Sequence, residues 1–102
     1  MTYSIKVLPE CIHEIVDICD WYDHKRPKLG DEFELSLDTT ITSILKTPKG
    51  YSILKRNIHK VKIARFPYNV FNVIESDVIL IIGVLHHSRS KKQLRKIIKR
   101  DL

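Results

Sequence analysis

Cysteine is scarce in this 102-residue chain, which holds only Cys11 and Cys19. If one helix carries both, their separation of eight positions corresponds to a rise of about 12 Å, which is too far for a disulfide. Reduced thiols are typical of a reducing compartment. We therefore expect a cytoplasmic protein without disulfides.

Patterns that hold metals or phosphates are also missing. Cys11, His13 and Cys19 lack zinc-finger spacing, and on one helix they cannot all face the same ion. His13-Glu14 lacks the second histidine of a zinc-protease helix, and the three glycines form no phosphate-binding loop. We expect neither a metal nor a cofactor.

Long apolar runs are absent as well. The longest, Val78–Leu85, is too short to span a bilayer, and the N-terminus lacks the apolar stretch of a signal peptide. The chain has no internal repeat and no Ser/Gly-rich linker. These features predict one domain over residues 1–102 that does not contact a membrane.

Acidic residues are nearly missing from the second part of the chain. Residues 1–38 hold nine acidic and four basic residues, whereas residues 39–102 hold fourteen basic and three acidic ones. The stretch 89–100 has seven basic residues and no acid. Such a split indicates a positive surface for a polyanionic or acidic partner, or else a solvated basic face.

Hydrophobic periodicity divides the chain into short strands and helices. The strand patterns are period-two or continuously apolar, and the helical patterns repeat every three to four residues. We expect a strand at Tyr3–Leu8, a helix from Glu10 to Pro27, a second helix from Lys28–Asp31 to Pro48, strands around 60–63, at Tyr68–Glu75 and at Val78–Leu85, and a basic helix over Lys91–Arg100 within a helical tail, 91–102.

The helical patterns predict which faces are buried. On the first helix the expected apolar stripe is Ile12, Ile15, Val16, Cys19 and Tyr22, with Glu14, Asp17 and Asp20 facing water. Trp21 and Tyr22 are expected to pack in or beside the core. The second helix should bury Leu29, Phe33, Leu37, Ile41 and Ile44.

These elements predict an α+β domain in which an antiparallel helix hairpin packs on a mainly antiparallel sheet, in the order βααβββ, followed by the basic C-terminal helix. Val78–Leu85 is apolar on both faces, so we expect it to be the central strand. The hairpin can cover only one face of that strand. The tail or a partner should close the other face.

Three consecutive antiparallel strands bring two strand ends to one edge of the sheet. Polar residues expected to converge there are Lys62, Arg65, Tyr68, His86, His87, Ser88 and Arg89. RNA cleavage at such a site needs a group that accepts the 2′-hydroxyl proton and cations that stabilise the phosphorane, and His, Arg and Lys supply these. His86 and His87 are neighbours on an extended chain, so their side chains should point to opposite faces, and at most one should face the site.

Four segments of the chain carry a family resemblance. Lys62-Ile-Ala-Arg65-Phe66-Pro67-Tyr68-Asn69-Val70, followed by Val84-Leu85-His86-His87-Ser88-Arg89, resembles the basic strand, "RFPY", hydrophobic strand and "H-x-x-R" of RelE/ParE toxins. Ile18-Cys-Asp-Trp-Tyr22 and Arg26-Pro-Lys-Leu-Gly30-Asp-Glu-Phe33 resemble the helix hairpin of the same family, "YY…RPGLGxxF". The resemblance covers about residues 3 to 90.

The resemblance implies a toxin of a type II toxin–antitoxin system, a family that includes plasmid stabilisation proteins. Its partner would be a cognate antitoxin whose acidic or amphipathic segment wraps the toxin, with a heterotetramer as one possible assembly. Val78–Leu85 and the basic tail are the expected antitoxin-binding region. The residues expected to bind partner or target are Lys62, Tyr68, Lys91, Lys92, Arg95, Lys96, Lys99 and Arg100.

The resemblance leaves two targets open. ParE-like members inhibit DNA gyrase, and RelE-like members cleave mRNA in the ribosome. In a nuclease, Arg65 matches the arginine that acts on the phosphate, and His86 or His87 with Arg89 falls where further catalytic groups lie. Several cleaving members carry a functional tyrosine near the C-terminus, but this chain has none after Tyr68. That departure favours gyrase inhibition, with mRNA cleavage as the alternative.

Two further classes of function remain open on the residues alone. One is a non-toxic basic module that binds nucleic acid, although the basic portion has few aromatic residues suited to stacking on bases. The other is an inactive toxin that still binds its antitoxin.

Overall fold

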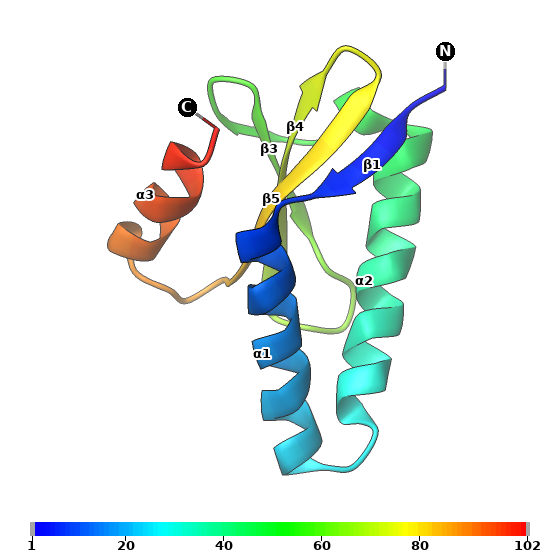
Figure 1. Cartoon of the computed structure of the whole chain (residues 1–102), viewed down its shortest axis with the longest axis vertical. Helices are drawn as coiled ribbons and strands as arrows, with labels where there is room; N and C mark the ends of the chain where they lie inside the picture. Colours follow the sequence, from blue (N-terminus) through cyan, green and yellow to red (C-terminus); the bar gives the residue numbers. More distant parts are fainter. Residues whose placement is uncertain (1, 102) are drawn as a thin grey trace.

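The computed structural model describes residues 2–101, and Leu102, the last residue of the expected tail, lies outside this range. Figure 1 shows a hairpin of two long helices, a twisted sheet and a short C-terminal helix. The elements are β1 (Ser4–Val7), α1 (Pro9–Lys25), α2 (Leu29–Lys46), a 3₁₀ turn (Pro48–Gly50), β2 (Ile53–Lys55), β3 (Ile58–Lys62), β4 (Tyr68–Glu75), β5 (Val78–His86) and α3 (Lys91–Lys99). The expected α+β fold is confirmed.

The sheet has five strands in the order β1-β5-β4-β3-β2, with β1 parallel to β5 and the remaining pairs antiparallel. Strand β5 has a neighbouring strand on each side, as its apolar sequence indicates. It was expected to be the central strand of the sheet, but that position is occupied by β4. Strand β2 was not predicted. It has three residues, and Ile53 and Lys55 are exposed at the sheet edge, so it carries no burial pattern.

The helix hairpin is tight because of one glycine. A Cβ on Gly30 would lie 2.5 Å from the carbonyl oxygen of Cys19, so only glycine allows α2 to start this close to α1. The backbone N–H of Gly30 also donates a 2.7 Å hydrogen bond to the Asp23 carboxylate. This contact fixes the antiparallel approach of the helices.

The buried face of α1 differs from the expected stripe. Ile12 and Val16 are each 50% exposed, whereas Cys11 is fully buried and Ile15, Ile18 and Cys19 pack against the core with Tyr22. The positions 11, 15, 18 and 22 repeat at helical spacing. The predicted stripe overlapped this one and omitted Cys11, which behaves here as a small apolar side chain.

The second face of the sheet is covered by α3, on the side opposite the hairpin (Figure 1). Ile97 is 1% exposed and packs with Phe71, Val73 and Ile82. A Cβ on Gly83 would lie 2.8 Å from Ile97, so the missing side chain at Gly83 allows the helix to dock on β5. The expectation that the tail closes this face is confirmed.

One ion pair ties the C-terminal segment to the hairpin. Both terminal nitrogens of Arg100 contact the Glu14 carboxylate at 3.0 Å, and one also donates to the Ile82 carbonyl oxygen at 2.9 Å. Glu14 therefore does not face water as expected, because it accepts hydrogen bonds from Arg100 in the part-buried space between α1 and β5.

Strands β3 and β4 bury a polar pair. His59 and Asn72 are paired across the strands and are 6% and 0% exposed. The Nδ1 atom of His59 and both side-chain polar atoms of Asn72 make no hydrogen bond within residues 2–101. Burial lowers the pKa of His59, so the folded protein favours the neutral ring.

This burial predicts a loss of stability in mild acid. As the pH falls below about 6.5, the histidine protonates in the unfolded chain before it does so in the folded protein. The free energy of unfolding should therefore fall between neutral pH and the lowered pKa, as measured by urea denaturation. His59→Leu should flatten this dependence, and His13→Leu, an exposed control, should not. Equal slopes in both variants would contradict the assignment.

Candidate functional site

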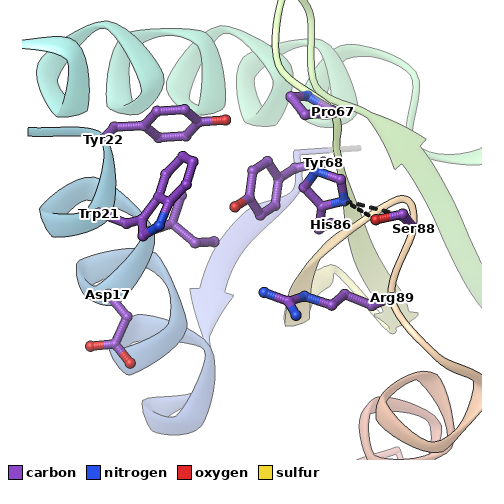
Figure 2. A pocket seen from close by; sticks show the side chains of 9 residues that line it. Asp17, Trp21, Tyr22, Pro67, Tyr68, His86, Ser88 and Arg89 are labelled. Atoms are coloured by element: carbon purple, nitrogen blue, oxygen red, sulfur yellow. Dashed lines mark hydrogen bonds between the residues drawn. The ribbon is translucent and has the colours of Figure 1, made fainter. Parts of the chain in front are cut away.

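Two hollows lie at the edge where β3 and β5 end and β4 begins, one on each side of Tyr68. The first, here the α1 hollow, has a volume of about 610 Å³ and lies between α1 and the strand ends (Figure 2). The second, the β3 hollow, has a volume of about 310 Å³. Its lining residues are Lys62, Pro67, Tyr68, Asn69 and His87, whereas those of the α1 hollow are Asp17, Ile18, Trp21, Tyr22, Pro67, Tyr68, His86, Ser88 and Arg89.

His86 is the last residue of β5, and its tautomer follows from its partner. The backbone N–H of Ser88 donates to His86 Nδ1 at 3.1 Å, and the Ser88 hydroxyl lies 2.7 Å from the same atom. A backbone N–H can only donate, so Nδ1 carries no proton and the neutral ring holds its proton on Nε2. Burial, then the nearby His87 and Arg89, lower the pKa of His86. His86 therefore presents a neutral N–H donor.

His87 has the opposite tautomer. Its Nδ1 lies 3.1 Å from the carbonyl oxygen of Pro67, which also accepts the backbone N–H of His87 at 2.9 Å. A carbonyl oxygen can only accept, so Nδ1 carries a proton, and in the neutral ring Nε2 has a free electron pair. An imidazole oriented in this way by a carbonyl is suited to accept a proton.

The two rings do not point to opposite faces of the sheet, and that expectation is wrong. They stack with centroids 4.7 Å apart and planes inclined by 25°. The reason is that β5 ends at His86, so His87 already lies in the following turn and follows no strand alternation. Each ring nevertheless lines a different hollow.

The two arginines of the expected cluster are separated. Arg89 lines the α1 hollow, and Figure 2 shows its guanidinium extending toward the side where Asp17 lies. Arg65 lines neither of these hollows, and its guanidinium is 3.2 Å from Glu32, which also binds Arg26 at 2.7 Å. Arg65 lies in the turn between β3 and β4 and has a positive φ of 71°. The structure thus brings Arg89, but not Arg65, beside the histidines.

Tyr68 separates the hollows and is largely buried. Its ring meets the His86 ring edge-on at 5.1 Å and packs against Tyr22 and Phe33. Burial raises the pKa of Tyr68, so its hydroxyl stays protonated near neutral pH. Lys62 is exposed and pairs across the strands with Asn69, which places its charge at the β3 hollow.

Two residues of the α1 hollow were not predicted from the sequence. Asp17 was expected only to face water and Trp21 to pack in or beside the core, but both line the hollow, and Trp21 is 54% exposed. They lie four positions apart on α1, and so on one face of the helix. Their spacing indicated a shared face, but not that this face turns toward the end of β5.

The basic tail forms a separate surface on α3. Its exposed residues are Lys91, Lys92, Arg95, Lys96 and Lys99. Arg100 does not add to this surface, because its guanidinium is held by Glu14.

Within residues 2–101 no group of three or more His, Cys, Asp or Glu side chains is arranged to hold a metal ion. None of the helices in the same range combines the length and the apolar character needed to cross a bilayer.

The sequence matches no protein-family profile and no curated protein. Its structure is similar to solved structures of toxins. A double arginine-to-alanine mutant of E. coli toxin RelE in the free state superposes with a TM-score of 0.74 at 17% identity, over 100% of both chains. The isolated E. coli RelE toxin gives 0.64 at 18% identity, covering 98% of this chain and 99% of RelE.

A chain of the chromosomal ParDE toxin–antitoxin system from P. aeruginosa gives a TM-score of 0.74 at 12% identity, covering 83% of this chain and 96% of that one. These similarities extend over most or all of each chain. This chain has the fold of the RelE/ParE toxins.

Proposed function

We propose that this protein is the toxin of a type II toxin–antitoxin pair and that it cleaves mRNA, the alternative that the sequence left open beside gyrase inhibition. The fold that it shares with RelE and with the ParDE system supports the first part. The stacked histidine pair supports the second part, because hydrogen bonds hold the rings in opposite tautomers. A surface that only binds gyrase has no need of that arrangement.

The chemistry follows from the two tautomers. A phosphate lying across the exposed edges of the stacked rings can contact both. Nε2 of His87 takes the proton of the 2′-hydroxyl, whose oxygen attacks phosphorus and displaces the 5′-oxygen, which takes a proton from solvent. The products are a 2′,3′-cyclic phosphate and a 5′-hydroxyl. The N–H of His86 and the charge of Lys62 stabilise the negative charge of the transition state.

The missing C-terminal tyrosine does not oppose this chemistry. A tyrosine would serve there as a proton donor or acceptor, and His87 already provides a proton acceptor on a turn fixed by two hydrogen bonds to the Pro67 carbonyl.

Two assays on the purified protein separate the two targets. The toxin is added to ribosomes that translate a defined mRNA, and in parallel to gyrase with relaxed plasmid. We expect new mRNA ends in the first assay and normal supercoiling in the second. Blocked supercoiling with intact mRNA would favour gyrase inhibition and refute the proposal.

The partner antitoxin is expected to bind the basic surface of α3 through an acidic segment. Replacing Lys92, Lys96 and Lys99 with Gln should slow association by roughly threefold or more at low salt, because exposed charges act mainly on the association rate. Stopped-flow mixing with the antitoxin encoded beside the toxin measures this rate. A control with Gln at Lys6, Lys46 and Lys49 removes the same charge elsewhere, and equal slowing in both variants would contradict a role for α3.

A further inference from the structure

We infer that the α1 hollow is a binding site for a guanine base and that Asp17 is the residue that selects it. This inference deepens the proposed function and rests on it, since the base would belong to the RNA that the histidine pair cleaves. Figure 2 shows the hollow bounded by Trp21 and Tyr68, with Asp17 and Arg89 on either side and His86 beside Ser88 at one end.

The walls of the hollow suit a flat aromatic ligand. Trp21 is the only tryptophan of the chain, and more than half of its surface is exposed although it is a large apolar side chain. Tyr68 and Tyr22 form the inner wall, and the cavity volume of about 610 Å³ is ample for a nucleobase with its ribose. Stacking on aromatic side chains is the usual way in which proteins hold an unpaired base.

The two charges of the hollow select among ligands. Asp17 makes no hydrogen bond or ion pair within residues 2–101, and neither does the Arg89 side chain, so both are free to bind. A free phosphate would be repelled by Asp17, and a cation would be repelled by Arg89. A neutral ligand with donors on one side and acceptors on the other fits both groups.

Among the bases, guanine meets this requirement. A carboxylate only accepts hydrogen bonds, and it has two oxygens to do so. Guanine offers two adjacent donors, N1–H and N2–H₂, whereas the same edges of adenine, cytosine and uracil hold no two adjacent donors. Guanine also offers O6 and N7, the pair of acceptors that arginine recognises with two hydrogen bonds. Asp17 can therefore bind the donors while Arg89 binds the acceptors.

The position of the hollow connects it to cleavage. His86 lines the hollow and also stacks on His87. A guanine held by Asp17 would leave its own ribose and phosphate beside the histidine pair. Cleavage would then occur next to guanines.

The test measures base binding without any cleavage. The indole N–H of Trp21 gives a single NMR signal, which is followed while GMP, AMP, CMP or UMP is added to the full-length protein. We expect a saturable shift with GMP at a concentration at least tenfold below that needed for the other three nucleotides. Equal responses to all four, or none, would overturn the inference, even if the protein cleaves mRNA.

Two variants test whether Asp17 selects guanine. In Asp17→Asn the side chain offers one donor and one acceptor, so it should weaken GMP binding by tenfold or more and shift the preference toward AMP. Asp38→Asn, an exposed change on α2, should bind as the wild type does. A preference for GMP that persists in Asp17→Asn would refute the role of Asp17. Binding of GMP without any mRNA cleavage would instead refute the proposed function and leave the guanine site standing.

Discussion

Replacing His87 with alanine should lower the rate of mRNA cleavage by on the order of 10²-fold or more, because in the proposed reaction His87 accepts the 2′-hydroxyl proton. The side chain is exposed and follows the end of β5, so the melting temperature should change little. Single-turnover cleavage on ribosome-bound mRNA measures the rate, and circular dichroism checks the fold.

A histidine outside the site provides the matched control. His13 is exposed on α1, so His13→Ala should cleave at the wild-type rate. If His87→Ala keeps its cleavage activity at normal stability, or if both variants lose it equally, then the histidine pair does not perform the chemistry.

Replacing Glu14 with glutamine should destabilise the protein by about 2 kcal/mol, since the change leaves the part-buried guanidinium of Arg100 without its carboxylate. For a domain of this size that loss corresponds to a fall in melting temperature of roughly 10 °C. The same change should release the C-terminal end of α3 from α1 and β5. Hydrogen exchange of the α3 amides should become faster than in the wild type.

Two comparisons isolate the ion pair. Glu34→Gln makes the same substitution at an exposed position of α2 and should change the melting temperature by no more than about 2 °C. Glu14→Met together with Arg100→Met removes both charges and should cost less than Glu14→Gln alone, because no charge is left unpaired. A double variant that is less stable than the single one would contradict this account.

Boundaries marked by turn residues were predictable from the sequence. The expected strand Tyr68–Glu75 has the bounds of β4, because Pro67 precedes it and the Ser76–Asp77 turn follows it. The helix hairpin was predictable for a similar reason, since apolar periodicity and flanking prolines coincide there. The C-terminal helix was predictable from its amphipathic pattern alone. The three-residue strand β2 was not predictable, because it is too short and too exposed to show a period.

The site was predictable only in part. Antiparallel topology placed Tyr68, His86, His87 and Arg89 at one edge of the sheet, and the structure brings them together there. The stacking of the two rings depends on where β5 ends, to within one residue, and a hydrophobic pattern does not define that point. Likewise, the pairing of Arg65 with Glu32 depends on a positive φ that the residue type does not indicate.

Contacts between segments that lie far apart in the chain could not be predicted from the sequence. Asp17 and Trp21 face the end of β5 because of the rotation of α1, which packs Cys11, Ile15, Ile18 and Tyr22 against the core. Arg100 appeared to belong to the basic run, but its partner Glu14 lies on the first helix, far away in the chain. Opposite charges on two helices have many possible pairings, and only the packed fold selects one.

The chemistry of the RNA ends tests the central claim most directly. An mRNA that carries a single 2′-deoxynucleotide at a mapped cleavage site is placed in the ribosome with the purified protein, beside the all-ribose mRNA. We expect the ribose substrate to give 2′,3′-cyclic phosphate and 5′-hydroxyl ends, and the deoxy substrate to stay intact at that position. Cleavage of the deoxy substrate, or ends with a 3′-hydroxyl and a 5′-phosphate, would show that the 2′-hydroxyl is not the nucleophile and would contradict the role assigned to His87.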